Sequence, residues 1–467
     1  MYKTIVVKSL QRARRNITKD FYSKSLFNYK TIPTVQPISK EYGLVSNIMK
    51  SGSFYQFLVD SHKECGDVIT FNLFDRSSIS INHPELFHKF TKVFNRMKEK
   101  KVNNQYATIL GEDSIFFAED DDGKARRKNY IDVIMSSNSI QTSYFHHLTR
   151  IMNNELELWN KTEQSKEELN LTATCYRLTL NLIVSSIVGE VSPKEISYII
   201  DCYNFAYHEL YRRAMFRDIP APGSERDLKY NEVIKGIKDF FESKIDSNSS
   251  NTIFMEHLKK ENDRNRTISE AMGLVFAGHH TTGNSLVWTL YYLFQNPNTL
   301  KKAVEEVDSV LGDSKIVTYD MITKLRYLKA CVNEALRLSS LVPMQSKVDY
   351  ENDIVIEERD MLIPKGTGVY LFIGGVNSSE NVWNKPEEFR PERFKEESAK
   401  FHHQFIPFAM PGRVCPGKAF SYVEQLTVLS SLLKNFKYQV TNEKVNIDYG
   451  IVVAPKEEIK IKLEKRL

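Results

Sequence analysis

The chain has 467 residues, of which 41% are hydrophobic and 26% are charged, an ordinary balance for a globular protein. Its formal net charge of +5 is too small for the dense cationic surface of a nucleic-acid-binding protein, so we expect no nucleic-acid partner. The mean hydropathy of −0.40 argues against many membrane-spanning helices. Five widely spaced cysteines without a Cys-x-x-Cys pair argue against a disulfide framework or a zinc cage and favour a reducing compartment.

The N-terminus is basic, with no acidic residue before Asp20. The apolar run at residues 5–7 is too short for a signal-peptide core or a membrane span. Such a start is typical of a mitochondrial presequence, of a segment lying on anionic lipid, or of a solvated tail. We therefore predict a flexible, peripheral-membrane or targeting segment over residues 1–28, ahead of a large domain over 29–467. We expect no transmembrane anchor, and a cytoplasmic or peripheral-membrane location with mitochondria as the third option.

Local patterns predict a mostly helical chain with short strands at both ends. In chain order, the predicted elements are an irregular segment at 29–43, strands at 68–73 and 78–81, a helix from residue 84, helices at 156–188, 230–245, 268–294 and 300–311, strand-like residues at 354–372, a coil at 380–412 and a helix at 416–434. Thr267 and Glu270 form a capping-box pattern for the longest helix, and Pro297 ends it. These patterns predict a mainly α fold with small β-sheets (α+β), built as one large domain.

A turn-rich segment at residues 408–417 contains Cys415 just before a predicted helix. The start of that helix and the nearby Arg413 both favour a thiolate. Gly412 and Gly417 let the backbone approach a flat ligand closely. The alternative is a buried, inert cysteine near a helix start, which is the commoner meaning of a single cysteine.

Two further motifs lie on predicted helices. Glu334 and Arg337 are three residues apart and share a helix face, where an exposed ion pair is the common meaning unless Arg393 from the following coil returns to them. In the uncharged long helix, Ala277 and Thr281 share a face on which small side chains leave room for a ligand. A threonine hydroxyl there can also bond to the carbonyl four residues earlier.

The adjacent His279 and His280 project about 100° apart around the helix, so they cannot chelate one metal together. The simplest interpretation is one core histidine and one that is partly exposed.

In order, the chain shows A-G-x-x-T-T on a long helix, E-x-x-R, P-E-R-F and F-x-x-x-x-R-x-C-x-G. Together these motifs resemble the cytochrome P450 family of haem-thiolate enzymes from about residue 29 to the C-terminus. The resemblance implies a single helical domain with a long central helix and peripheral antiparallel sheets, a haem b cofactor, and O₂ as co-substrate. It also implies electrons that come from NADPH through a separate reductase or ferredoxin.

The resemblance assigns a role to each motif residue. Cys415 would be the axial thiolate ligand of the haem iron. The other residues that it implies at the haem are Phe408, which shields the sulfur, Gly417, the propionate partners Arg413, Arg126 and Lys347, and the groove residues Ala277 and Gly278. Thr281 would hold water and O₂, with His280 as a proton relay. Glu334, Arg337 and Arg393 would form a buried structural triad.

Three positions depart from the family pattern. Pro411 stands where the family has glycine, so the segment before Cys415 must use different backbone dihedrals. His280 stands where an acid is common, as it does in the sterol 14-demethylase branch. Ala125 occupies the position of a propionate-binding Trp or His. The first and third departures bear on haem affinity, and the second slightly favours a sterol 14-demethylase-like lineage.

These motifs favour a monooxygenase that hydroxylates or demethylates an apolar lipid, sterol or terpenoid. Basic residues on the cysteine side, among them Arg127 and Lys418, suit an acidic redox partner. Two alternatives stay open: an O₂-independent haem-thiolate isomerase, against which Thr281 argues, and a non-catalytic or degenerate haem-binding protein, which Pro411 and Ala125 favour.

Overall fold

The structure is a computed structural model, and it describes most of the chain. The described residues are 32–39, 41, 43–73, 76–94, 104–118, 120–216, 218–246, 252–260, 263–356, 361–396, 404–410 and 414–466. The predicted basic segment at residues 1–28 lies outside these ranges, and so do Pro411, Gly412 and Arg413.

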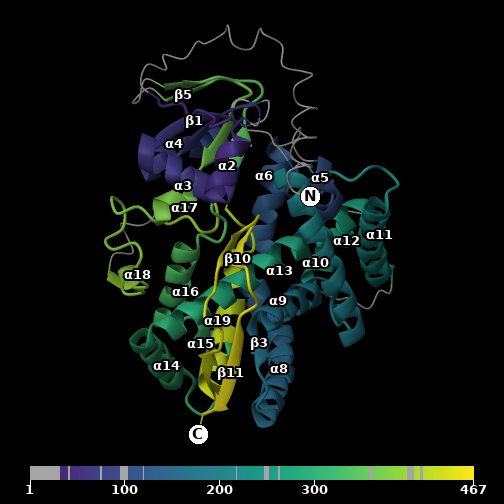
Figure 1. The fold of residues 1–467 in the computed structure, drawn as a ribbon. Helices are drawn as coiled ribbons and strands as arrows, with labels where there is room; N and C mark the ends of the chain where they lie inside the picture. Colours follow the sequence, from purple (N-terminus) through teal and green to yellow (C-terminus); the bar gives the residue numbers. More distant parts are fainter. Residues whose placement is uncertain are drawn as a thin grey trace.

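Helices make up most of the described chain (Figure 1). They are α2 (Val45–Ser51), α3 (Phe54–Cys65), α4 (Pro84–Phe94), α5 (Asn104–Leu110), α6 (Asp120–Asn129), the π-helical turn η3 (Tyr130–Ile134), α7 (Ser137–Ser139), the π-helical turn η4 (Ile140–Tyr144), α8 (Phe145–Ser165), α9 (Leu171–Val188), α10 (Pro193–Phe216), α11 (Glu225–Asp246), α12 (Ile253–Lys260), α13 (Arg264–Gln295), α14 (Pro297–Leu311), α15 (Tyr319–Ile322), α16 (Arg326–Ser339), α17 (Ile373–Asn377), α18 (Arg393–Glu396) and α19 (Lys418–Asn435).

Short strands form four small sheets. The strands are β1 (Val68–Leu73), β2 (Arg76–Ile81), β3 (Leu169–Asn170), β4 (Gln345–Val348), β5 (Ile354–Ile356), β6 (Met361–Ile363), β7 (Gly368–Leu371), β8 (Phe436–Val440), β9 (Ile447–Tyr449), β10 (Val453–Pro455) and β11 (Lys460–Lys465). The sheet orders are β1-β2-β7-β4, β3-β11-β8, β5-β6 and β10-β9. The strand pairs are antiparallel as expected except for β2 and β7, which run parallel with Ile79 opposite Val369. A parallel pair needs a long crossover, and the whole helical region supplies it.

The central helix α13 has 32 residues, so it is about 48 Å long and crosses the domain (Figure 1). It begins earlier than the capping-box pattern predicts, because the side chain of Asp263 caps it by accepting from the Arg266 N–H. Glu270 is therefore free of the capping role and binds elsewhere. As predicted, the helix ends before Pro297, which opens α14.

The predicted continuous helix at 156–188 is wrong, because the chain breaks between α8 and α9. Lys166 takes a left-handed conformation with φ of 60° and ends α8. Asn170 then caps α9 by accepting from the Ala173 N–H. Helix α9 is long and apolar enough to cross a membrane, but 78% of it is buried in the protein and it packs along α13. It is therefore a core helix.

The sheet-rich and helical parts lie at opposite ends of the molecule in Figure 1, with β1, β5, α2, α3 and α4 at one end and α8, α14 and β11 at the other. A large apolar core surrounds α13, and two smaller cores lie under the sheet-rich end. The segment that contains Cys415 leads into α19, which packs against α13.

Candidate functional site

The cysteine segment turns back on itself before α19 begins. The Cys415 N–H donates to the carbonyl of Phe408 at 2.8 Å, which closes the loop between these two residues. Gly417 occupies the N-cap position of α19. A Cβ added to Gly417 would lie 3.8 Å from the Cys415 sulfur, so glycine leaves the space beside the sulfur open. Because Pro411 and Arg413 lie outside the described residues, their roles stay predictions.

The sequence pattern predicts a thiolate at Cys415, but the protein alone favours the thiol. Burial raises the pKa of the Cys415 thiol. The backbone N–H of Gly417 and the charges of Arg127 and Lys418 act in the opposite direction without reversing the shift. A bound metal ion deprotonates a coordinating thiol, so this sulfur would become a thiolate when it binds iron.

One face in the middle of α13 is less buried than the rest of that helix. Phe276, Ala277, Gly278 and Thr281 are only half-buried, whereas every other position from Ala271 to Leu290 is buried. The Thr281 hydroxyl donates to the Ala277 carbonyl at 2.6 Å, as the sequence suggests. Gly278 instead faces α9, where an added Cβ would lie 3.1 Å from Ile183. Its small size therefore serves helix packing, and the open face consists of Ala277 and Thr281.

The open face of α13 and the cysteine segment lie on neighbouring elements. Thr282, next to Thr281, shares a hydrogen bond of 3.2 Å with Ser421 on α19. Ser421 lies only six residues after Cys415. These contacts fix the helix that carries Thr281 against the helix that follows the cysteine.

His279 and His280 are both buried, so the expectation that one is partly exposed is wrong. Burial lowers the pKa of His279 to about 3, and it lowers the pKa of His280 well below its ordinary value. The His280 ring stacks on Tyr207 with ring centres 4.1 Å apart and meets Tyr176 edge-on. A neutral, stacked imidazole does not match the expected proton relay near pH 7.

Glu334, Arg337 and Arg393 come together in the interior. Both carboxylate oxygens of Glu334 accept from Arg337 at 2.9 Å, and one also accepts from Arg393 at 2.9 Å. The Arg390 N–H donates to the same carboxylate at 3.0 Å. Both guanidinium groups lie against the Trp383 ring, at 5.3 and 5.9 Å from its centre. The triad therefore joins α16 to the coil that leads to the cysteine segment.

The α6 residues differ from the arrangement expected around the haem propionates. Ala125 is exposed, so it does not occupy an inward position on α6. Arg126 binds Asp122 and the buried Glu270. Its neighbour Arg127 donates to the Val414 carbonyl at 3.3 Å, directly beside Cys415.

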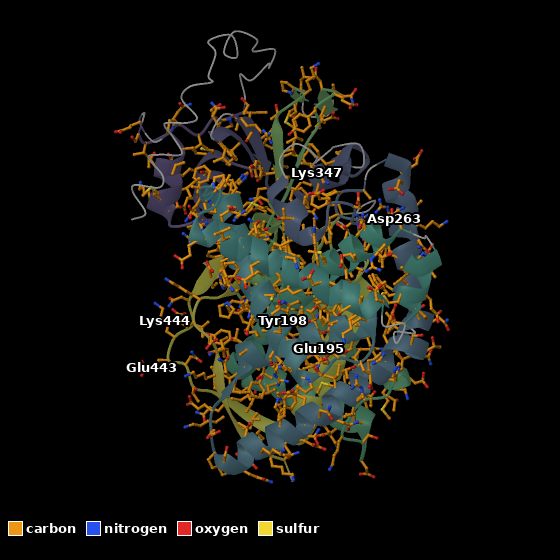
Figure 2. All side chains as sticks on the ribbon, turned by 90° about the vertical axis from the view of Figure 1, so that its right-hand side faces the viewer. Glu195, Tyr198, Asp263, Lys347, Glu443 and Lys444 are labelled. Atoms are coloured by element: carbon orange, nitrogen blue, oxygen red, sulfur yellow. The ribbon has the colours of Figure 1, made fainter. Side chains whose placement is uncertain are left out.

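Lys347 lies on β4, opposite Val369, and Figure 2 shows it in the upper part of the molecule, away from Glu443 and Lys444.

Sequence reasoning placed Arg127 only on a partner-facing surface. The adjacent basic pair at 126 and 127 marks the right part of the chain but does not tell which residue reaches the cysteine segment.

These residues fit a flat iron macrocycle held through sulfur. The Cys415 sulfur offers a soft ligand, Gly417 leaves open the space beside it, and the half-buried face of Ala277 and Thr281 lies on the adjoining helix. Among the described residues, no group of three His, Cys, Asp or Glu side chains could hold a metal ion instead.

The match to known proteins covers most of the chain. The family model described as cytochrome P450 matches residues 33–463. Cytochrome P450 4c3 of Drosophila melanogaster is 29% identical over 234 residues, which is 49% of this chain and 42% of that protein. The taurochenodeoxycholic 6 alpha-hydroxylase of Sus scrofa is 34% identical over 190 residues, which is 40% of this chain and 37% of that protein. The matched stretches thus span less than half of these two relatives.

A solved structure has the same fold. The haem domain of a cytochrome P450DA mutant superposes with a TM-score of 0.81 at 21% identity, covering 93% of this chain and 98% of that one. Because the family model spans nearly the whole chain, this protein belongs to the cytochrome P450 family.

Proposed function

We propose that the protein is a haem-thiolate monooxygenase that uses O₂ and two electrons to hydroxylate or demethylate an apolar substrate. The observation that carries the proposal is that Cys415 lies just before α19, which packs against α13, the helix whose half-buried face holds Ala277 and Thr281. Haem b supplies the oxidative chemistry when it is bound through a thiolate.

The chain's own residues would bind and orient the reactants. The Cys415 sulfur would ligate the iron, and Phe408, whose carbonyl fixes the Cys415 N–H, would shield it. Thr281 holds a proton at Oγ1, at present shared with the Ala277 carbonyl, on the open face of α13. The triad around Glu334 would hold the coil, and with it the cysteine segment, in place against α16.

The substrate is proposed as a lipid-like molecule. The name of the Sus scrofa relative describes hydroxylation of a bile acid. This name supports the proposal that the present protein hydroxylates a lipid or steroid. The narrower sterol 14-demethylase-like hypothesis rests on His280 and on Tyr106 upstream of Arg126, and the relatives reported above carry other names. We therefore favour hydroxylation of a lipid, sterol or terpenoid over membership of that branch.

An acidic reductase or ferredoxin would deliver the electrons at the cysteine side. Lys418 lies 5.9 Å above the Phe408 ring and Lys329 lies 4.8 Å above the Tyr422 ring, and these two rings contact each other. Both lysines are exposed. Two cations on one aromatic pair form an electropositive surface that suits an acidic partner.

The test is turnover with an NADPH-dependent reductase and a panel of lipids under isotope-labelled O₂. We expect substrate-dependent NADPH consumption and one labelled oxygen atom in the product. Product formation without O₂ or NADPH would establish the isomerase instead. Haem binding without either activity would establish the non-catalytic haem-binding protein.

We also propose that residues 29–467 form the haem-thiolate domain and that residues 1–28 are a separate basic segment. The charge of this segment suits contact with anionic lipid in a cytoplasmic or peripheral-membrane protein, and mitochondria stay the third option. Deleting residues 1–28 should leave haem binding intact and lower partition into the membrane fraction. Unchanged partition would remove the membrane role.

A further inference from the structure

Helix α6 lies between the central helix α13 and the cysteine segment. Two consecutive residues on α6, Arg126 and Arg127, project in directions about 100° apart around the helix axis. Arg126 reaches α13, where it binds Glu270 at 3.1 Å. Arg127 reaches the other way and donates from Nη1 to the Val414 carbonyl at 3.3 Å. Two adjacent residues of α6 therefore connect α13 to the cysteine segment.

The Arg126 side of this connection is anchored firmly. Glu270 is fully buried on α13, and its second oxygen accepts from the Ile115 N–H at 2.9 Å. Arg126 also donates to the Asp113 carbonyl at 2.5 Å and to Asp122 at 2.7 Å. These bonds tie α6, α13 and the loop at 111–118 together, so the position of Arg127 is set by the protein core.

The Arg127 side meets the residue directly before the iron ligand. Val414 precedes Cys415, whose own N–H is held by the Phe408 carbonyl. The single peptide group between Val414 and Cys415 is thus held at both ends, its N–H by the Phe408 carbonyl and its carbonyl by Arg127 of α6. The Arg127 bond is longer, at 3.3 Å, than the 2.8 Å bond from the Cys415 N–H, but its donor carries a full charge, and a charged donor strengthens a hydrogen bond.

We propose that Arg127 is a positioning residue for the cysteine segment: by holding the Val414 carbonyl at a place fixed by the Arg126–Glu270 pair, it keeps the Cys415 sulfur where it binds haem iron as a thiolate. The inference rests on the proposed function, because it presumes that Cys415 ligates the iron. Arg127 would hold the peptide backbone before Cys415, and Arg126 would anchor α6 to α13 through Glu270.

The test compares the haem-loaded, full-length Arg127→Gln, Arg127→Lys and Lys128→Gln variants with the wild type. Lys128 is the next residue on α6 and is exposed, so Lys128→Gln removes the same charge without touching the cysteine segment. The readout is the share of the reduced, CO-bound protein whose Soret band has the red-shifted thiolate position, with the rate of haem transfer to a haem acceptor as a second measurement.

We expect Arg127→Gln to raise the ratio of non-thiolate to thiolate forms about ten-fold, because a hydrogen bond to a charged group contributes roughly that factor to an equilibrium. Arg127→Lys should lie between Gln and wild type, since lysine keeps the charge but not the reach and fork of the guanidinium. Lys128→Gln should match the wild type.

Three results would overturn the inference. The first is an unchanged thiolate share in both Arg127 variants. The second is faster haem loss from Arg127→Gln with an unchanged thiolate share, because that pattern would assign Arg127 to the haem periphery. The third is an equal effect of Lys128→Gln, which would reduce the role to net charge. A wild type without any thiolate band would refute the proposed function itself. A wild type with the band and unaffected Arg127 variants would refute only the role of Arg127.

Discussion

The Glu334 carboxylate should be the most costly single group to remove from the triad. Glu334→Gln keeps the side-chain shape but leaves Arg337 and Arg393 without their counter-charge. The two guanidinium side chains are only 0% and 2% exposed, so water cannot replace the lost carboxylate. Breaking a buried ion pair on one side costs about 3–5 kcal/mol. That is a large part of the roughly 5–15 kcal/mol that stabilises a typical domain.

The assay is urea unfolding of the haem-loaded protein, followed by tryptophan fluorescence, because Trp383 lies against both arginines. We expect the folded-to-unfolded ratio of Glu334→Gln to fall roughly a thousand-fold. The matched control is Glu388→Gln, which removes an exposed carboxylate paired with Lys385 in the same coil and should leave the midpoint unchanged. Equal midpoints for the two variants would refute the account of the triad as a buried, charge-paired joint.

Three further predictions follow from other parts of the fold. Gly283→Ala should destabilise the protein by about 1–3 kcal/mol, because the added Cβ would lie 2.7 Å from the ring of Tyr176, and a thermal midpoint equal to that of the wild type would contradict this. His279 has a folded-state pKa of about 3, so below pH 6.5 the unfolded chain takes up a proton that the folded protein does not. The unfolding free energy should therefore fall by about 1.4 kcal/mol per pH unit from this residue alone as the pH drops. In His279→Gln, the loss of unfolding free energy between pH 7 and pH 5, measured by urea unfolding, should be smaller by about 2 kcal/mol. An unchanged pH dependence in this variant would show that the ring is not held neutral. Lys418→Glu should slow electron transfer from an acidic partner in stopped-flow reduction, and added salt should shrink the difference. Lys444→Glu at the exposed β8–β9 turn (Figure 2) should have no effect, and equal effects of both variants would remove the proposed docking surface.

Much of the fold could be predicted because long periodic segments dominate it. Helices α11, α13, α14 and α19, and the hairpin strands β1 and β2, lie where the patterns place them within a few residues. The break at Lys166 was missed because the apolar periodicity continues on both sides of a left-handed residue, which needs no glycine. The predicted start of α13 is one turn too late because Thr267 and Glu270 match a capping box, while Asp263 caps the helix earlier by accepting from the Arg266 N–H.

The site was less predictable because it depends on which elements meet in space. The spacing of Glu334 and Arg337 predicts their pairing, and the contact with Arg393 follows once the coil returns to α16. Nothing in the local pattern distinguishes Arg126, which binds a buried carboxylate, from Arg127, which reaches the cysteine segment.

The two histidines show the same limit of local pattern. Whether His280 is exposed depends on Tyr207 of α10, which lies more than seventy residues earlier in the chain and stacks on its ring.

The central claim is that Cys415 binds haem iron as a thiolate, and one spectrum tests it most directly. The full-length protein would be purified with haem supplied, reduced and exposed to CO, beside a Cys415→Ser variant. We predict the red-shifted Soret band of a thiolate-ligated ferrous–CO haem in the wild type and its loss in the variant. A wild-type band at the position of histidine-ligated or thiol-ligated haem, or no haem at all, would contradict the account.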